Sequence, residues 1–493
     1  MTDTHSYSES GSSGLSALKW SAIGLAGRQG LVALSYVIIA RFLGPEPYAV
    51  VALAISYVAL SLLLLDQGIS ASLISRGSIS RAVVGAAMSL NMLLAIAVGL
   101  VTFVAAPAIA GFFSQPDLEG VLRALAAGLI VKGATVIPRA VLSRRGAFGA
   151  LAKADVTGAV LGVTAGVAVA ASGGGVWAIV AQTVLMDCVT LLFLLLAARP
   201  PRLNLKLGHL RGHWGFSLNV FGSSSLGYLA SNSDNLLIAR FLGPQSLGLY
   251  SLPYTISQFP VALTGQVVSR VLFPIVARRR FQKLEVHSLV ERAIRGIALV
   301  TFPLMALLAA AAADLTSLFL GAEWLSAAPV LAILCISGAR QSITTLSGPV
   351  LLGLGRADIQ FKFSLAAAIV QVAGIVIGLN WGIVGVAIGY TTAGFLVTPA
   401  IAFLQRKFAG ISILRQVRAL VPSAHAALWL AAVYFFLRLV IDLPLPVTFV
   451  LCSIAALLTY LLVLFVAHRE VWSSLWRDFL SVYPSRKPRH DDR

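Results

Sequence analysis

The sequence predicts an all-α integral membrane protein of fourteen transmembrane helices, built as two six-helix lobes related by a parallel repeat, plus two C-terminal helices. Its composition is the first reason: of 493 residues, 58% are hydrophobic and 11% are charged, and the mean hydropathy is +0.89, outside the usage of soluble domains. Apolar runs of about 20 residues recur, the helical length that crosses a hydrocarbon core roughly 30 Å thick. The third reason is a hexapeptide, ARFLGP, present at 40–45 and again at 239–244.

The apolar runs define the expected helices in chain order. The predicted spans are 18–41, 48–72, 82–112, 120–142, 153–173, 176–197, 214–242, 247–275, 291–313, 327–353, 359–379, 382–404, 419–440 and 446–467. The first span has no small-residue cleavage motif, so we expect it to be retained. The division into domains follows: a disordered cytoplasmic tail at 1–14, an N-lobe at 15–212, a C-lobe at 213–418, helices 13 and 14 at 419–467, and a basic cytoplasmic tail at 468–493.

The charges between the spans predict the orientation. With the N-terminus in the cytoplasm, 28 of the 37 Lys and Arg residues fall in cytoplasmic segments, where basic residues collect in membrane proteins. The outside turns instead carry Glu46, Asp117, Glu119, Asp314, Glu323 and Asp442. Both termini are therefore expected in the cytoplasm. The net charge of +18 is explained by orientation and by contact with anionic membrane lipids, and no nucleic-acid-binding motif accompanies it.

The repeated hexapeptide marks an internal duplication. Each copy ends a span that starts inside, the first and the seventh, and leads through a short turn into the next span. A shift of 199 residues then maps spans 1–6 onto spans 7–12 in the same orientation. Parallel repeats of this kind build transporters whose site lies between the two halves. The alternative is chance recurrence of a common helix-ending turn.

Several classes of function lack their motifs in this sequence. There is no GxxxxGK[ST] loop for nucleotide phosphates, no HExxH or other paired histidine spacing for a metal, and no cofactor motif. The three cysteines, Cys188, Cys335 and Cys452, each lie singly within an apolar span. No outside loop is long enough for the soluble catalytic domain that a glycan polymerase or ligase would need. The pattern favours a transporter and no enzyme.

The chain also resembles a known family. The segments that carry the resemblance are DQGISASLISR at 66–76, GGGVWAIVAQ at 173–182, NSDN at 232–235, LLIARFLGPQSLGLYSLPYTISQFP at 236–260, VSRVLFPIVAR at 268–278 and GAEWLSAAPVL at 321–331. In this order they are similar to bacterial polysaccharide exporters of the multidrug/oligosaccharidyl-lipid/polysaccharide superfamily, often called Wzx-type or O-antigen flippases.

The resemblance implies fourteen helices and a central cavity lined by helices 1, 2, 7 and 8. It implies translocation of an undecaprenyl-pyrophosphate-linked oligosaccharide across the bacterial cytoplasmic membrane by alternating access. The product would serve O-antigen, lipopolysaccharide, exopolysaccharide or capsule biosynthesis, with polysaccharide polymerase and co-polymerase machinery as further partners. Two alternatives of the same fold stay open: a lipid II flippase, and an ion-coupled drug or cation antiporter, which should place carboxylates in the cavity.

Ionisable residues within spans are candidates for the site, because a charge in hydrocarbon must face a wet cavity, a partner or an interface. Arg28 lies well inside span 1 with Gln29 beside it, and Arg270 lies one turn from Gln266 in span 8. Their guanidinium groups would suit a pyrophosphate. The polar end of span 7 adds Asn232, Asp234 and Asn235 as cavity candidates. Alternatively, Arg28 or Arg270 forms a structural pair with Asp234 or Asp66.

The remaining intramembrane charges receive other predictions. Candidates for an ion site or a gate are Asp66, Asp234, Lys132 and Arg340, although a lobe-internal ion pair is favoured for Lys132 and Arg340. Asp155 and Asp187 are interpreted as structural. Four arginines close to span ends, Arg41, Arg123, Arg240 and Arg438, are interpreted as interface anchors. Residues 471–483 carry an apolar stripe that predicts an interfacial helix.

Overall fold

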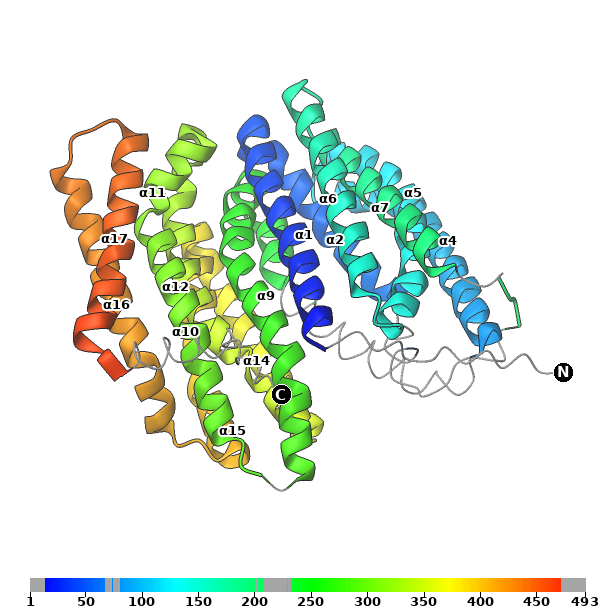
Figure 1. Ribbon diagram of the computed structural model, residues 1–493. Helices are drawn as coiled ribbons and strands as arrows, with labels where there is room; N and C mark the ends of the chain where they lie inside the picture. The colour runs from blue at the N-terminus through cyan, green and yellow to red at the C-terminus, as the bar shows by residue number, and fades with distance from the viewer. Residues whose placement is uncertain are drawn as a thin grey trace, which may run out of the picture.

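The computed structural model describes residues 14–66, 73, 80–199, 203–206, 228, 232–282 and 284–470, and every regular element within them is a helix (Figure 1). Most of the predicted spans lie along a single helix. The predicted spans 291–313 and 327–353 each cover two helices, and the second and seventh predicted spans are only partly described. Two predictions lie outside the described residues: the disordered tail, apart from its last residue, and the interfacial helix at 471–483.

The N-terminal group consists of six long helices. They are α1 (Gly14–Leu43), α2 (Pro45–Asp66), α4 (Arg81–Phe112), α5 (Pro116–Arg144), α6 (Phe148–Ala171) and α7 (Trp177–Ala198). Glycines at four-residue spacing, Gly158, Gly162 and Gly166, line the face of α6 that packs on α7, and a Cβ at any of them would clash with α7 atoms. Small residues at this spacing let two membrane helices approach closely. The α6–α7 pair is therefore tightly packed.

The C-terminal group follows a helical segment at 232–241. It comprises α9 (Pro244–Phe281), α10 (His287–Ala310), α11 (Ala312–Leu315), the π-helix η2 (Thr316–Leu320), the 3₁₀ helix η3 (Ala322–Ala327), α12 (Ala328–Thr344), α13 (Ser347–Gly353), α14 (Ala357–Gly378), η4 (Leu379–Trp381) and α15 (Gly382–Ala409). Figure 1 shows this group beside the N-terminal group, and the two groups meet where α1 and α9 lie next to each other.

Two further helices, α16 (Ile413–Val440) and α17 (Leu445–Ala467), lie at the edge of the C-terminal group (Figure 1). At one end of α16, Arg438 Nε lies 3.1 Å from the Asp314 carboxylate, and the Tyr434 hydroxyl donates to the same carboxylate at 2.7 Å. Arg438, which the sequence suggested as a snorkelling anchor, thus joins α16 to α11.

The described helices make the chain a multi-pass membrane protein. Within the described residues, eleven stretches are long and apolar enough to cross a bilayer, and one of them, Asp358–Ala409, runs from the second residue of α14 to the end of α15. Large apolar side chains such as Leu396, Leu428 and Leu439 lie exposed on the outside, as lipid contact requires. The count of fourteen spans, the two-lobe layout and the domain boundaries stay predictions.

Both copies of ARFLGP end a helix in the same way. Gly44 and Gly243 adopt positive φ values of 75° and 83°, which glycine tolerates without strain, and the following prolines begin α2 and α9. The predicted role of Gly-Pro as a helix-ending turn is confirmed. We call the end of the molecule that carries these two turns the turn face. The opposite end, where α10 and α16 begin, is called the basic face.

The largest buried apolar cluster joins the two groups close to the turn face. It contains Ala40 and Tyr48 from the N-terminal group together with Leu247, Tyr250 and Trp324 from the C-terminal group. The Tyr48 and Trp324 rings meet edge to face with centroids 5.6 Å apart. Apolar packing therefore holds the groups together on this side of the molecule.

Candidate functional site

A cavity of about 1040 Å³ lies between the N-terminal group and α9. Its lining comes from α1, α2, α5, α6 and α7 on one side and from α9 on the other. The resemblance implied a cavity lined by helices 1, 2, 7 and 8, and the first, second and eighth predicted spans do contribute as α1, α2 and α9. The fourth, fifth and sixth predicted spans, which are α5, α6 and α7, line it as well. The polar and charged lining residues are Arg28, Gln29, Tyr36, Lys132, Arg139, Ser143, Asp155, Thr183, Tyr254, Thr255 and Gln258.

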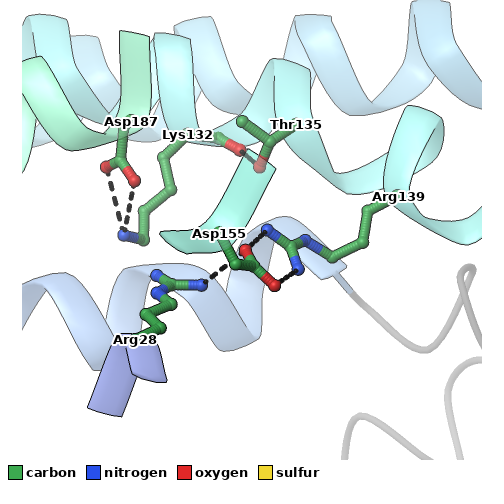
Figure 2. Close-up of polar contacts among 6 residues, drawn as sticks. All are labelled: Arg28, Lys132, Thr135, Arg139, Asp155 and Asp187. Carbon is green, nitrogen blue, oxygen red and sulfur yellow. Dashed lines mark hydrogen bonds and ion pairs between the residues drawn. The ribbon is translucent and has the colours of Figure 1, made fainter. Parts of the chain in front are cut away.

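The charged centre of the cavity wall is Asp155 of α6, which two arginines approach (Figure 2). Arg139 of α5 binds it in a bidentate manner, with N–O distances of 2.6 and 2.9 Å. Arg28 of α1 makes a single, longer contact of 3.4 Å to Asp155 Oδ1. About a third of each arginine side chain stays exposed, 32% for Arg28 and 34% for Arg139. Their outward N–H groups can therefore donate hydrogen bonds to an anion in the cavity.

A second ion pair lies deeper in the same wall. Lys132 Nζ is 3.1 and 3.3 Å from the two carboxylate oxygens of Asp187 on α7. Both side chains are nearly enclosed, with exposures of 12% and 6%. The lobe-internal ion pair favoured for Lys132 thus exists. With Arg28, Arg139 and Asp155, this pair gives the wall three positive and two negative groups, one positive charge in excess.

The sequence located part of this wall. Arg28, Gln29 and Lys132 line the cavity as intramembrane polarity indicated. Arg28 pairs with Asp155, and the described contacts of Asp234 are to Tyr250 and Asn235. Arg139 was missed as a site residue, although it lies seven positions after Lys132 and hence on the same face of α5. Asp155, interpreted as structural, is the link between the two arginines.

The three candidates from the end of span 7 do not line the cavity. Asp234 is 1% exposed and accepts hydrogen bonds from the Tyr250 hydroxyl at 3.1 Å and from the Asn235 backbone N–H at 2.8 Å. Asn235 is also buried, and Asn232 donates to the Tyr228 carbonyl at 3.1 Å. Asp234 and Asn235 are therefore enclosed by protein, while Asn232 is half-buried. The side chains of Asp66, Gln266 and Arg270 lie outside the described part of the structure.

The α9 side of the cavity is neutral and continues into a hydrogen-bonded network. Gln258 Nε2 donates to Gln341 Oε1 at 3.0 Å and contacts the Tyr390 hydroxyl at 3.4 Å. Tyr254 stands edge to face against Tyr390. Arg340, one position before Gln341, has no carboxylate partner among the described residues; its guanidinium lies 5.9 Å from the Phe395 ring centroid. The ion pair favoured for Arg340 is thus not seen.

The arginines of the two hexapeptides contact opposite groups at the turn face. Arg41 of α1 donates from Nη1 to the carbonyls of Leu318 and Phe319 in η2, at 2.7 and 3.0 Å. Arg240 lies 5.4 Å from the ring centroid of Phe112 at the end of α4. Each arginine therefore crosses between the groups, a role that the interpretation as interface anchors did not include.

The beginnings of α2 and α9 also touch at the turn face. A Cβ placed on Gly248 would overlap the carbonyl of Pro45, so the two backbones meet with no room for a side chain. These contacts close the turn face between the groups.

Residues 38–329, more than half of the chain, match the family model described as polysaccharide biosynthesis protein. Lipopolysaccharide biosynthesis protein WzxC of Escherichia coli (strain K12) is 28% identical over 386 residues, covering 76% of this chain and 77% of that protein. Teichuronic acid biosynthesis protein TuaB of Bacillus subtilis (strain 168) is 29% identical over 304 residues, covering 61% and 62%. Succinoglycan biosynthesis transport protein ExoT of Rhizobium meliloti (strain 1021) is 24% identical, covering 73% of each chain.

Solved structures share the fold at low sequence identity. Lipid II flippase MurJ in an inward closed conformation superimposes with a TM-score of 0.74 at 14% identity, covering 92% of this chain and 99% of that chain. An inward-facing multidrug resistance MATE family transporter superimposes with a TM-score of 0.61 at 18% identity, covering 79% and 98%. Together with the family match over residues 38–329, the sequence and the fold establish that the chain belongs to the polysaccharide biosynthesis protein family.

Proposed function

We propose that this protein is a flippase that moves an undecaprenyl-pyrophosphate-linked oligosaccharide across the bacterial cytoplasmic membrane by alternating access, for surface polysaccharide biosynthesis. The observation that carries the proposal is the pair of partly exposed guanidinium groups, Arg28 and Arg139, facing a large cavity within the membrane-spanning helices. Membership of the polysaccharide biosynthesis protein family supports the class of cargo.

The chemistry of the cavity suits a pyrophosphate. Guanidinium groups bind phosphate oxygens with paired N–H donors, and Asp155 holds Arg28 and Arg139 close together while leaving N–H groups of both free to bind. The enclosed Lys132–Asp187 pair contributes no net charge, so the arginines supply the excess that an anion neutralises. Neutral donors and acceptors for sugar hydroxyls come from Gln29 and Gln258.

The polyprenyl tail would stay in the lipid while the head group and glycan occupy the cavity. A volume of about 1040 Å³ accommodates the pyrophosphate and the first sugars, with a longer glycan extending towards the basic face. In this state the turn face is closed by Arg41, Arg240 and the Pro45–Gly248 contact. Transport then requires these contacts to open while the groups close at the basic face. The proposal places the basic face and both termini in the cytoplasm.

The rival cargoes make different demands on the cavity. Lipid II shares the pyrophosphate, so the arginines are compatible with it and family membership is what favours surface polysaccharide. A drug or cation antiporter needs a carboxylate that can bind a cation. Asp155 is engaged by two guanidinium groups and Asp187 by Lys132, which disfavours that cargo. Association with polymerase machinery is proposed from the pathway alone.

The proposal is tested by deleting the gene and following surface polymer and lipid-linked intermediates. We expect polymer to disappear from the surface and intermediates to accumulate inside, and plasmid-borne wild-type protein to restore export. Arg28→Ala should fail to restore it at normal protein level. Arg123→Gln is the matched control, since Arg123 lies on α5 in an exposed pair with Glu119 away from the cavity. Unchanged polymer in the deletion strain would refute the proposed function.

A further inference from the structure

A second pocket, of about 770 Å³, lies at the basic face between α10, α16 and α17. It shares no lining residue with the cavity described above. Its walls come from the start of α10, the first turns of α16 and the end of α17. The lining residues are Glu291, Arg295, Arg415, Arg418, Pro422, Val466, Ala467, His468, Arg469 and Glu470.

The pocket carries an excess of positive charge. Four of its lining residues are arginines and two are glutamates, which leaves two positive charges in excess. Arg295 is paired with Glu291 at 3.3 Å within α10. Arg415 and Arg418 lie three positions apart on α16 and are exposed, and neither has a carboxylate partner in the described part of the chain. Their mutual repulsion within one pocket would be relieved by a bound anion.

The surroundings of the pocket are those of a lipid boundary. Leu414, Val417 and Val421 on α16 are 47–58% exposed, and Leu462 and Phe465 on α17 are 60% and 50% exposed. These apolar side chains extend from the charged pocket along the membrane-spanning parts of both helices. A ligand with an anionic head group and acyl chains matches a charged pocket that continues into exposed apolar helix surfaces, whereas a soluble anion would contact only the arginines.

The two ends of α16 differ in how they are held, and the pocket lies at the basic-face end. At the turn-face end, Arg438 and Tyr434 join α16 to Asp314 of α11. At the basic-face end, the side chains of α10 and α16 that line the pocket bring like charges together. An anion between Arg295, Arg415 and Arg418 would add a polar link to the apolar packing that joins α10 and α16 at this end.

We propose that this pocket binds the phosphate of an anionic phospholipid from the leaflet at the basic face, and that the lipid joins α16 and α17 to the C-terminal group. Arg415 and Arg418 contact the phosphate, and Arg469, two residues after the end of α17, closes the pocket. The acyl chains lie along the exposed apolar residues of α16 and α17. The inference is independent of the cargo in the main cavity.

The test is native mass spectrometry of the full-length detergent-solubilised protein titrated with phosphatidylglycerol, phosphatidylcholine or inorganic phosphate. We expect phosphatidylglycerol to bind and phosphatidylcholine to bind much more weakly. Arg415→Gln combined with Arg418→Gln should weaken phosphatidylglycerol binding by roughly thirtyfold, about fivefold for each cation removed. Arg406→Gln with Lys407→Gln, which removes two charges from the end of α15, is the control and should leave it unchanged.

Three outcomes would overturn the proposal: equal binding of both phospholipids, equal binding to the wild type and the glutamine variant, or displacement of the lipid by inorganic phosphate at the same concentration. The last would identify a site for soluble anions. Arg415→Lys with Arg418→Lys retains the charges and should retain binding. Loss of binding in a well-folded lysine variant, judged by gel filtration, would show that the paired N–H donors of guanidinium, beyond the positive charge, hold the phosphate at this site.

Discussion

The two walls of the main cavity differ in how they carry polarity. Among the residues whose side chains the structure describes, the N-terminal wall holds the charged lining residues of the cavity, Arg28, Lys132, Arg139 and Asp155. The described lining residues of α9 are Tyr254, Thr255, Gln258, Phe259 and Ala262, and these are uncharged. Every ion pair of the charged wall joins helices of the same group. Relative motion of the groups can therefore leave these pairs intact. The described contacts that must open between the groups join Arg41 to backbone carbonyls and Arg240 to an aromatic ring, so opening them separates no ion pair.

This difference has an energetic reason. Separating an ion pair in a medium of low dielectric constant leaves uncompensated charges and costs several kcal/mol, while a neutral hydrogen bond contributes about 0.5–1.5 kcal/mol. A transporter that kept its pairs across the moving interface would meet that larger cost in every cycle. Confining charge to one wall lets the cargo stay bound to that wall while the other moves.

The largest effect should come from the enclosed pair of the charged wall. Lys132→Met leaves Asp187 buried without a partner, which we expect to destabilise the protein by about 3–5 kcal/mol and to reduce its abundance in the membrane. Thermal unfolding of purified protein and immunoblots of membranes measure this. The double variant Lys132→Met with Asp187→Leu should recover most of the stability. Failure of the double variant to recover would contradict a purely structural role for the pair.

Arg139 tests whether the charged wall binds the cargo. Arg139→Gln removes bidentate contacts while the fold keeps the Lys132–Asp187 pair, so we expect the export rate at limiting substrate to fall about 10–100-fold. Measuring export against the supply of lipid-linked precursor separates weaker binding from slower turnover. Arg123→Gln should behave as wild type. A variant with unchanged dependence on precursor supply would remove Arg139 from the binding wall.

The turn face provides a test of motion between the walls. Gly248→Val places a side chain against the Pro45 carbonyl, and overpacking of this kind costs about 1–3 kcal/mol, so the closed turn face should be disfavoured. We expect a cysteine at Thr255 in the cavity to react faster with a membrane-impermeant maleimide added from the turn-face side. The background should carry Cys188→Ser, since that thiol is exposed. An equal rate of labelling with and without the valine would argue against the Pro45–Gly248 contact as part of the closure of the turn face.

The smallest effect is expected on the neutral wall. Gln258→Leu loses hydrogen bonds to Gln341 and Tyr390 but uncovers no charge, so export should fall less than about tenfold and protein abundance should stay close to wild type. The same export assay measures it beside Arg139→Gln. A larger loss for Gln258→Leu than for Arg139→Gln would reverse the assignment of the two walls.

The sequence predicted the positions of most helices well. It predicted poorly which side of each helix points to lipid, to the cavity or to other helices. Apolar length placed most helices to within several residues, and the Gly-Pro turns marked the starts of α2 and α9, because hydrocarbon thickness and backbone conformation are local requirements. Lipid-facing and buried positions are both apolar in a membrane helix, so the periodicity that orients a soluble helix carries little signal. Asp234 was therefore predicted in the cavity, although Tyr250 and the surrounding helices enclose it.

Pairing of charges was the other part that sequence could not supply. Arg28 was singled out because a lone guanidinium deep in a span needs a reason. Its partner Asp155 lies 127 positions away on α6, and only the packing of α1 against α6 brings them together. Arg139 could have been added from its helical register with Lys132, since both then point to one face of α5. The inter-group contacts of Arg41 depend on the π-helix in the other half and had no local signature.

The touching turns also bear on how the two halves of the gene can diverge. In the duplication that the sequence predicts, most positions of one half are free to change without regard to the other. The Gly-Pro turns are an exception, because α2 and α9 begin against each other and Gly248 leaves no space beside Pro45. A change in the backbone of either turn therefore alters the contact between the starts of α2 and α9. The contact between Pro45 of the first hexapeptide and Gly248, four residues after the second, thus supplies a reason for the two turns to keep the same backbone in two halves that otherwise differ.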